Sequence, residues 1–294
     1  MATVVISHPE KVLFPDDGIT KGDLAAYYAL VAPLMLPHLR GRPVTMERFN
    51  RGIGVAGFIQ KSIARGAPDW LDRVEVPKHG GTVTHPLIND AESLQWLANQ
   101  NCITPHVWAS RVPRLSHPDV CLFDLDPLVE DDDVLRSIVL EVRDVLAELG
   151  LTSWPKTTGS KGFHVAVPLD GKADAGTVAA FAHAVGRILV QRRPRDVTME
   201  FSKADRDGKI YVDTGRNHPP ATFASPYAVR PKPGAPVSAP CTWEEIESGM
   251  AGPRSFRMGM MSKRVASIGD LWAPLLTQGQ SLNPAIGRLS KRSS

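Results

Sequence analysis

Between residues 120 and 213 the chain alternates short apolar runs with longer amphipathic ones, and this alternation restricts the possible folds more than any other feature. Residues 120–125 are a short apolar run that ends in acid, a pattern typical of a buried strand. Residues 134–149 carry apolar side chains at helical spacing. Three aspartates precede this run and complement the positive end of a helix, while Gly150 supplies a natural C-terminal cap.

The same alternation continues towards residue 213. Two predicted strands, a predicted Ala-rich helix and a further predicted pair of strands follow in order: 154–158, 163–167, 177–190, 197–201 and 209–213. Gly159 to Gly162 predicts a turn between the first two strands, and Asp207-Gly208 predicts a hairpin between the last two. The pattern indicates a mostly antiparallel sheet that carries the acidic residues.

The first hundred residues predict an additional mixed α/β portion. Thr20 with Asp23 resembles a capping box before a helix, and residues 44–49 predict a strand. Asp90 predicts the cap of another short helix. The fold class is therefore α/β or α+β.

Composition places the chain among ordinary globular proteins. It has 294 residues, 43% hydrophobic and 22% charged, with a formal net charge of +3. No apolar run approaches the roughly 20 residues of a membrane span, and the N-terminus does not resemble a secretory signal. Three cysteines without a CxxC pair favour reduced thiols in a cytosolic compartment. Residues 218–240 are rich in proline, but interleaved Phe223, Tyr227 and Val229 predict an ordered extended segment.

The acidic pair Asp124 and Asp126 is the first candidate for chemistry. Side chains two residues apart on a strand point to the same face, about 7 Å apart at the backbone. Carboxylates so close repel each other unless a cation lies between them, and oxygen-only ligands suit magnesium or manganese. Asp213 ends another short strand in the same manner. Three such carboxylates can hold two ions about 4 Å apart, although exposed strand-end acids are the commoner explanation of a bare DxD.

The turn Thr158-Gly159-Ser160-Lys161-Gly162 is the second candidate. Its glycines let backbone N–H groups approach an anion, and its hydroxyls and lysine add donors and charge. It lacks the spacing of a Walker motif, and an ordinary hairpin is the simpler alternative. His106 and His164 are more often structural than catalytic at such positions. Zinc is a weak alternative, with Cys102 and His106 or His117 and Cys121 four residues apart.

Seven motifs in a fixed order resemble the archaeo-eukaryotic primase superfamily, and more closely the polymerase domain of bacterial non-homologous end-joining ligases and its stand-alone relatives. The motifs extend over nearly the whole chain: Glu10 to Pro15 with Thr20-Lys21, Phe58 to Lys61, Pro105 to Val107, Phe123 to Pro127, Gly159 to His164, Val212-Asp213 and Tyr227 to Arg230. The resemblance implies a primase-like catalytic core with an RRM-like mixed sheet and an N-terminal α/β portion. We expect one domain over residues 1–294, with an N-terminal portion of about 1–115, a catalytic core of about 116–240 and a C-terminal wrap of about 241–294.

The resemblance also implies roles for individual residues. Asp124, Asp126 and Asp213 match the metal ligands for two Mn²⁺ or Mg²⁺ ions, and transfer of nucleotides to a 3′-hydroxyl, often ribonucleotides, is expected. The matches to triphosphate-binding positions are His106, Thr158, Ser160, Lys161 and Arg230. Lys11 and Lys21 match lysines that bind a downstream 5′-phosphate, and Phe58 matches a platform for a template base.

Two positions depart from the family pattern. After Asp213 the family often has an aromatic residue and Gln, whereas this chain has Thr214 to Asn217, with Arg216 adding charge near the phosphates. The template platform is usually a pair of aromatics, but here Phe58 precedes Ile59.

The expected partners are gapped or end-joined DNA with a 5′-phosphate, NTP or dNTP, a separate DNA ligase and a Ku-like end-binding protein, but no membrane. The expected location is cytoplasmic and nucleoid-associated, and the absence of ligase and nuclease modules predicts a stand-alone enzyme. Two rivals stay open. One is another metal-dependent phosphoryl enzyme, such as a nuclease or an aspartyl phosphatase, although Pro127-Leu128 lacks the phosphatase pattern. The other is a non-catalytic DNA-binding module with this fold.

Overall fold

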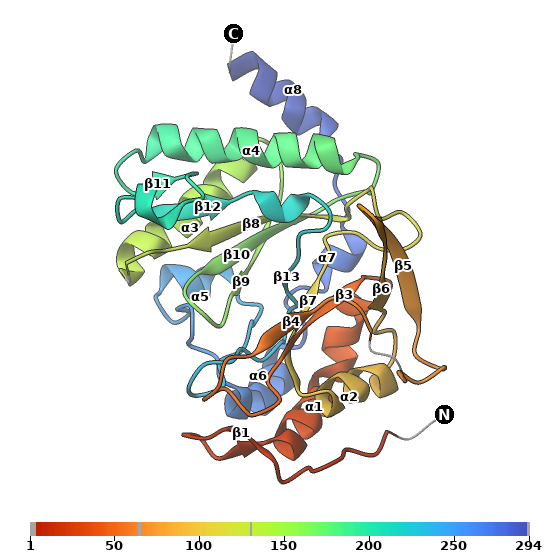
Figure 1. The fold of residues 1–294 in the computed structure, drawn as a ribbon. Helices are drawn as coiled ribbons and strands as arrows, with labels where there is room; N and C mark the ends of the chain where they lie inside the picture. The colour runs from red at the N-terminus through yellow and green to blue at the C-terminus, as the bar shows by residue number, and fades with distance from the viewer. Residues whose placement is uncertain (1–3, 64–65, 130, 293–294) are drawn as a thin grey trace. The chain divides into compact units, whose positions relative to one another are not determined.

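A computed structural model describes residues 4–63, 66–129 and 131–292 (Figure 1). The chain divides into two compact units. Unit 1 comprises Met1–Pro113, Thr222–Ser238 and Phe256–Asp270, and unit 2 comprises Arg114–Ala221, Ala239–Ser255 and Leu271–Ser294. Residues beyond 240 contribute to both units. The single-domain organisation stays a prediction.

Unit 2 contains a five-stranded sheet in the order β11-β12-β8-β10-β9. The strands are β8 (Val120–Asp126), β9 (Trp154–Thr157), β10 (Phe163–Pro168), β11 (Val197–Thr198) and β12 (Ile210–Asp213). All neighbouring pairs are antiparallel except β11 with β12, which is parallel. The sheet is therefore mixed and mostly antiparallel, which confirms the predicted fold class.

Two long helices pack on this sheet, α3 (Asp132–Glu148) near β10 and α4 (Ala175–Arg192) near β8 (Figure 1). Asp131 caps α3 by accepting from Val134 N at 3.0 Å, and Gly150, with φ of +76°, follows the helix end as predicted. Shorter helical segments complete the unit: η1 (Lys203–Asp205), η2 (Gly215–Asn217), α5 (Trp243–Glu247), α7 (Pro274–Thr277) and α8 (Asn283–Arg292).

The predicted hairpin at Asp207-Gly208 is wrong. The two residues do form a turn with positive φ, but β11 and β12 run parallel, and β11 ends at Thr198 rather than Phe201. Arg206 explains the difference, because its guanidinium donates to the carbonyls of Glu200 and Phe201 at 3.2 and 3.0 Å. These bonds hold the segment before the turn as a loop instead of a strand.

Unit 1 contains a four-stranded antiparallel sheet in the order β13-β7-β3-β4. Its strands are β3 (Val44–Arg48), β4 (Phe58–Gln60), β7 (Cys102–Val107) and β13 (Phe223–Ala224). Two two-stranded sheets accompany it, β1 (Val12–Phe14) with β2 (Ile19–Thr20) and β5 (Arg73–Lys78) with β6 (Gly81–Pro86).

Helices α1 (Lys21–Leu39) and α2 (Ala91–Asn99) pack together in unit 1, which also contains η3 (Met258–Met260) and α6 (Met261–Ile268). Thr20 and Asp23 form the predicted capping box, and Asp90 caps α2. The proline-rich segment is ordered as predicted, since Phe223, Tyr227 and Val229 are buried. In the described part of the chain, no helix is both long and apolar enough to cross a membrane.

Candidate active site

The three predicted acids lie on one face of the five-stranded sheet in unit 2. Asp124 and Asp126 are at the end of β8, while Asp213 is the last residue of β12 and the direct cross-strand partner of Asp124. Directly opposed residues project to the same face with Cβ atoms about 5 Å apart. The structure therefore brings the acids together by strand register, while Phe123 and Leu125, which alternate with the acids along β8, are fully buried on the opposite face.

Two basic residues extend this row across the sheet. His164 on β10 is the other cross-strand partner of Asp124, and Lys156 on β9 is the partner of His164. The Nε2 atom of His164 lies 3.3 Å from Asp124 Oδ1. Lys156 is fully buried with its ammonium 5.7 Å from the centre of the Trp272 ring. From β12 to β9, the row thus consists of Asp213, Asp124, His164 and Lys156.

Each carboxylate is paired with a guanidinium group. Arg216 Nε lies 2.9 Å from Asp213 Oδ2 and 3.3 Å from Asp124 Oδ2. Arg206 Nη1 lies 3.1 Å from Asp126 Oδ2, and its guanidinium also stacks 4.1 Å from the centre of the Tyr211 ring. These cations relieve the repulsion between the acids.

Burial and neighbouring charge separate the pKa values of the two adjacent acids. Burial by itself would raise the pKa of Asp124, but His164, Arg216 and Lys156 hold this pKa well below its ordinary value. Burial raises the pKa of Asp213, with the charge of Asp124 adding to the rise and Arg216 opposing it. Burial and then Lys156 lower the pKa of His164 to about 4, so its imidazole is neutral at pH 7. Of these two acids, Asp124 is therefore the one more firmly held as a carboxylate.

The donor set fits divalent cations in its chemistry. Carboxylate oxygens are ligands that Mg²⁺ and Mn²⁺ prefer, and all three acids project from one face. In this structure the acids are paired with arginines. Among the described residues, no three His, Cys, Asp or Glu side chains are grouped closely enough to hold an ion. The carboxylates point to Arg206 and Arg216 instead.

The predicted glycine turn packs directly against the end of β8. A Cβ atom on Gly162 would lie 1.6 Å from the carbonyl oxygen of Leu125, so only glycine allows this approach. Thr158 holds the turn: its hydroxyl donates to Gly162 O at 2.9 Å and accepts from the backbone N–H groups of Ser160 and Gly162 at 3.1 Å each. Thr158 is thus the internal brace of the turn, and the outward-facing donors belong to Ser160 and Lys161.

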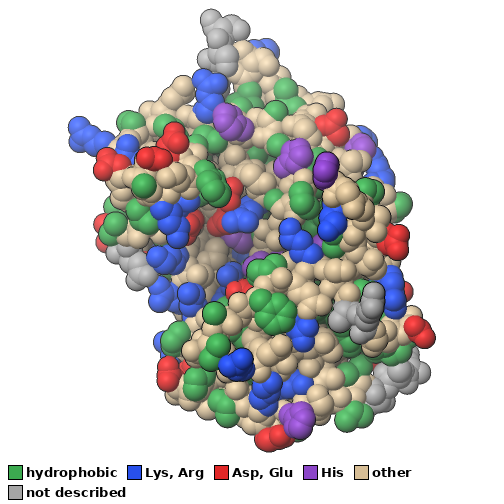
Figure 2. All heavy atoms as spheres, viewed as in Figure 1, with side chains coloured by type: hydrophobic (Ala, Val, Ile, Leu, Met, Phe, Trp, Pro, Cys, Tyr) green, Lys and Arg blue, Asp and Glu red, His purple; other side chains and the backbone are tan. Residues whose placement is uncertain are grey.

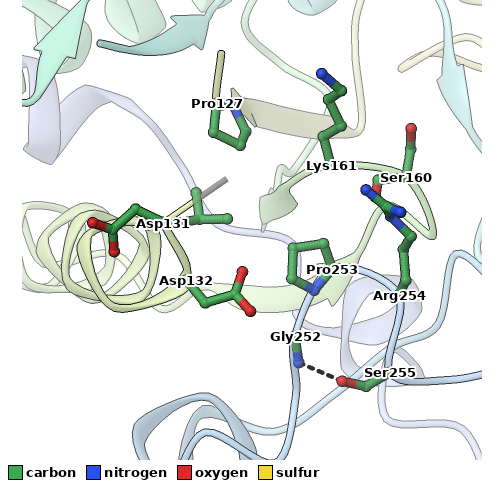
Figure 3. A pocket seen from close by; sticks show the side chains of 10 residues that line it. Pro127, Asp131, Asp132, Ser160, Lys161, Gly252, Pro253, Arg254 and Ser255 are labelled. Atoms are coloured by element: carbon green, nitrogen blue, oxygen red, sulfur yellow. Dashed lines mark hydrogen bonds between the residues drawn. The ribbon is translucent and has the colours of Figure 1, made fainter. Parts of the chain in front are cut away.

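A pocket of about 340 Å³ opens beside this turn (Figure 3). Ser160 and Lys161 come from the turn, while Asp131 and Asp132 come from the start of α3 on the other side. Arg254 reaches in from a third segment and donates from Nε to Ser160 O at 2.7 Å. Figure 3 shows the Lys161 side chain extending away from the pocket wall formed by Gly252 and Pro253. The turn is therefore buttressed by Arg254, and Lys161 remains exposed.

The other predicted triphosphate residues, His106 and Arg230, belong to unit 1. His106 on β7 contacts Glu47 on β3, with 3.0 Å between Nε2 and Oε2. Burial would raise the pKa of Glu47, but His106 and Arg230 lower it below its ordinary value. The three residues form a local charge cluster. Cys102 is fully buried at the other end of the same strand. Cys102 and His106 are therefore too far apart to bind one metal ion together.

Lys11 and Lys21 are joined through their backbones in unit 1. Lys21 N donates to Lys11 O at 2.8 Å. The Lys21 ammonium contacts Ser7, at 2.7 Å from its carbonyl oxygen and 3.1 Å from its hydroxyl, and the side chain is almost fully buried. Burial, the charge of Lys11 and the charge of Arg48 lower the pKa of Lys21. The Lys21 ammonium is thus held against Ser7, and binding of a 5′-phosphate by the two lysines stays a prediction.

Phe58 lies on the edge strand β4 with 44% of its surface exposed, and its neighbour Ile59 is 57% exposed. Arg48 on the adjacent strand lies over the Phe58 ring, with 5.4 Å between Cζ and the ring centre. Exposed apolar side chains beside cations are suited to stacking against nucleic-acid bases. The role of Phe58 as a platform for a template base stays a prediction.

Sequence reasoning missed four residues that contact predicted site residues: Glu47 in unit 1, and Lys156, Arg206 and Arg254 in unit 2. Lys156 had a readable signal, because a lysine inside the predicted strand 154–158 shares a face with Thr158 and Trp154. The contacts of Arg206 and Arg254 join segments far apart in sequence, 80 and 94 residues from their partners. No local pattern carries that information.

Comparison with known proteins agrees with this fold. A family model described as "LigD, primase-polymerase domain" matches residues 20–272. The chain is 36% identical over 280 residues to the multifunctional non-homologous end joining protein LigD of Mycolicibacterium smegmatis, covering 92% of this chain and 36% of that protein. It is 32% identical over 293 residues to the same-named protein of Pseudomonas aeruginosa, covering 98% and 34%.

A solved structure, the polymerase domain from Mycobacterium tuberculosis Ligase D in complex with DNA, superimposes with a TM-score of 0.88. It is 35% identical, and the match covers 94% of this chain and 99% of that one. These matches confirm the predicted class, a metal-dependent, DNA-directed nucleotidyltransferase with a primase-polymerase fold. The chain belongs to the LigD primase-polymerase domain family. It spans about a third of the length of the LigD relatives named above.

Proposed function

We propose that this chain extends the 3′-hydroxyl of DNA at short gaps or broken ends, copying a template and favouring ribonucleotides. The observation that carries the proposal is the register of β8 and β12, which places Asp213 directly beside Asp124 with Asp126 two residues further on the same face. Membership of the LigD primase-polymerase domain family supports the same reaction.

The proposed cofactor is a pair of Mn²⁺ or Mg²⁺ ions held by Asp124, Asp126 and Asp213. When bound, such ions supply activation of a hydroxyl and neutralisation of phosphate charge. The chain's own residues prepare the ligands. His164 orients Asp124 through its contact at 3.3 Å, and the Gly215 N–H donates to Asp213 Oδ1 at 2.8 Å.

The proposed triphosphate site begins at the glycine turn. The hydroxyl of Thr158 fixes the backbone, so that Ser160 and Lys161 present their side chains next to the end of β8. Charge-assisted donors of this kind bind phosphate oxygens strongly. The additional roles of His106 and Arg230 rest on the family resemblance.

The proposed nucleic-acid partner is a gapped or end-joined duplex with a 5′-phosphate. The solved relative of this family is described in complex with DNA. Lys11, Lys21 and Phe58 supply a positive site and an exposed aromatic ring in unit 1. On the face seen in Figure 2, Lys and Arg side chains are spread widely with acidic side chains among them. Local basic sites therefore matter more for DNA binding than the net charge of +3.

The proposed biological setting is end joining, because the full-length relatives are named as non-homologous end joining proteins. A DNA ligase and a Ku-like end-binding protein are the partners this setting requires. The chain matches only the polymerase part of those relatives.

A labelled gapped duplex tests the proposal and its rivals together. The protein is incubated with the duplex, Mn²⁺ and either NTP or dNTP, and the labelled strand is sized. Extension by the templated nucleotide, faster with NTP, is the expected result. Shortening of the strand would indicate a nuclease, and retention without change would indicate a binding module; either result contradicts the proposal.

A further inference from the structure

The guanidinium of Arg216 occupies the space between the two adjacent acids of the candidate active site. Its Nε lies 2.9 Å from Asp213 Oδ2 and 3.3 Å from Asp124 Oδ2. A single positive group is thus paired with both carboxylates that an ion would have to share.

We propose that Arg216 is a resident counter-cation of the metal site, which a divalent ion must displace before Asp124 and Asp213 can bind it. The inference rests on the proposed function, because it takes these acids as metal ligands. If the inference holds, a higher concentration of the metal ion is needed to fill the site. When a ligand binds only the competent fraction of a protein, its apparent affinity falls by that fraction.

The geometry of the acids agrees with displacement. In the described part of the chain, the carboxylates are not grouped closely enough to hold an ion. Both oxygens nearest to Arg216 belong to the acids that strand register places side by side. An ion that bridges Asp124 and Asp213 therefore competes with the guanidinium for the same carboxylates.

The Arg216 side chain is more exposed than that of Arg206, the other arginine that pairs with the acids. The side chain of Arg216 is 39% exposed, whereas the side chain of Arg206 is 5% exposed and is anchored to two backbone carbonyls. The neighbouring Asn217 fixes the turn, because its amide donates to Leu122 O at 2.7 Å and accepts from Leu122 N at 2.7 Å. A rotation of the Arg216 side chain towards solvent leaves this anchor intact.

The first test is a Mn²⁺ titration of the protein without DNA or nucleotide, in which free ion is measured by electron paramagnetic resonance. Arg216→Gln is expected to bind Mn²⁺ about three- to tenfold more tightly than the wild type, since it removes the competing ion pairs. Arg192→Gln is the matched control: Arg192 also pairs with two carboxylates of unit 2, those of Glu141 and Glu148, and its loss changes the net charge equally. Equal affinity of Arg216→Gln and wild type, or equal tightening by Arg192→Gln, would overturn the inference.

The second test observes the guanidinium itself. In a nitrogen-15 NMR titration with diamagnetic Mg²⁺, the Arg216 Nε–H signal is expected to move from a paired to a solvated position, with the same dissociation constant as ion binding. Asp124→Asn should weaken both the binding and the shift. A signal that stays unchanged at saturating Mg²⁺ would overturn the inference.

The two tests are independent of the polymerase assay. A protein that exchanges Arg216 for an ion but extends no DNA would contradict the proposed function alone. A protein that extends DNA while Arg216 keeps its carboxylates at saturating ion would contradict the inference alone.

Discussion

Asp124, Asp126 and Asp213 illustrate how strand register places reactive residues next to each other. Their positions at strand ends were predicted from the sequence, and the structure places Asp213 opposite Asp124. The roles of these acids as metal ligands stay a prediction. Arg216 was noted in the sequence, three residues after its partner Asp213. Arg206 could not be found from a local pattern, because it is 80 residues away from Asp126 in sequence.

At the same scale, Lys161 offers a test of the triphosphate site. Lys161→Ala removes an exposed cation from the glycine turn without touching the Thr158 brace. We expect a higher KM for nucleotide and a loss in kcat/KM equivalent to about 2–4 kcal/mol, because a charge-assisted contact to phosphate is lost. Steady-state kinetics on a primed template measure both quantities. Lys172→Ala, another exposed lysine of unit 2, serves as control, and wild-type kinetics of Lys161→Ala with normal folding would show that Lys161 is only a solvated turn residue.

Among the elements, the glycine turn and β8 depend on each other. Gly162→Ala places a Cβ atom 1.6 Å from Leu125 O, so either the turn or the strand end has to shift. We expect a loss of roughly 1–3 kcal/mol in the free energy of unfolding from overpacking, together with loss of nucleotide addition. Chemical denaturation and an extension assay measure the two effects. Gly176→Ala on α4 meets only an ordinary contact at 3.5 Å and should preserve both properties; equal behaviour of the two variants would contradict this account of the turn.

The contact between β6 and β3 predicts a pH dependence of stability. Burial lowers the pKa of His85, and a hydrogen bond from its neutral Nδ1–H to Val44 O at 3.1 Å only partly opposes this shift. The folded-state pKa is lowered, so the contribution of His85 to stability is complete above the ordinary value of about 6.5 and is lost as pH falls towards the folded-state value.

Denaturation midpoints between pH 7 and 5 measure this effect. His85→Gln should flatten the pH dependence of the unfolding free energy, by at most about 1.4 kcal/mol per pH unit. His79→Gln, on the exposed turn after β5, should leave the pH dependence unchanged. An unaltered slope in His85→Gln would show that His85 does not titrate with unfolding.

Elements with strong local signals were predictable from the sequence, and elements defined by distant contacts were not. The caps of α1 and α2 and the antiparallel pair β9–β10 follow from capping residues and turn chemistry. The parallel pairing of β11 with β12 does not, because a two-residue strand has too little pattern to reveal its partner. The prediction of a turn at Asp207-Gly208 was correct, but the prediction of a hairpin was wrong. The same residue types favour turns with positive φ whether or not the flanking strands pair with each other.

For the whole molecule, the sequence predicted the mixed fold and the family, because ordered motifs extend over nearly the entire chain. The division into two compact units could not be predicted, since each unit combines segments from three separate parts of the sequence. The predicted portions, with boundaries at about 115 and 240, are continuous in sequence, whereas each unit is defined by segments that pack together.

At the scale of the whole DNA substrate, we predict a preference for gaps that carry a 5′-phosphate. Lys11 and Lys21 lie next to each other, and a terminal phosphate with up to two negative charges would pair with both. The wild type is expected to bind a short gap with a 5′-phosphate more tightly than the same gap with a 5′-hydroxyl, and the difference should fade as salt rises.

The double variant Lys11→Ala/Lys21→Met should remove this preference but preserve extension of a simple primed template. Methionine retains the apolar bulk of the buried Lys21 side chain. Lys78→Ala, at the exposed end of β5, is the control and should retain the preference. Fluorescence anisotropy on the two gapped duplexes measures the affinities. Equal affinity of the wild type for both duplexes would exclude 5′-phosphate recognition through these lysines.

The acids of β8 and β12 are proposed to catalyse nucleotide addition to DNA. The most direct measurement is the rate of single-nucleotide addition to a gapped duplex with Mn²⁺, made for wild type, Asp124→Asn and Asp213→Asn, with DNA affinity determined on the same samples. We predict measurable addition by the wild type, a loss of roughly a thousandfold or more in each variant, and DNA affinity unchanged within a few-fold. Near-normal addition by either variant would contradict the claim.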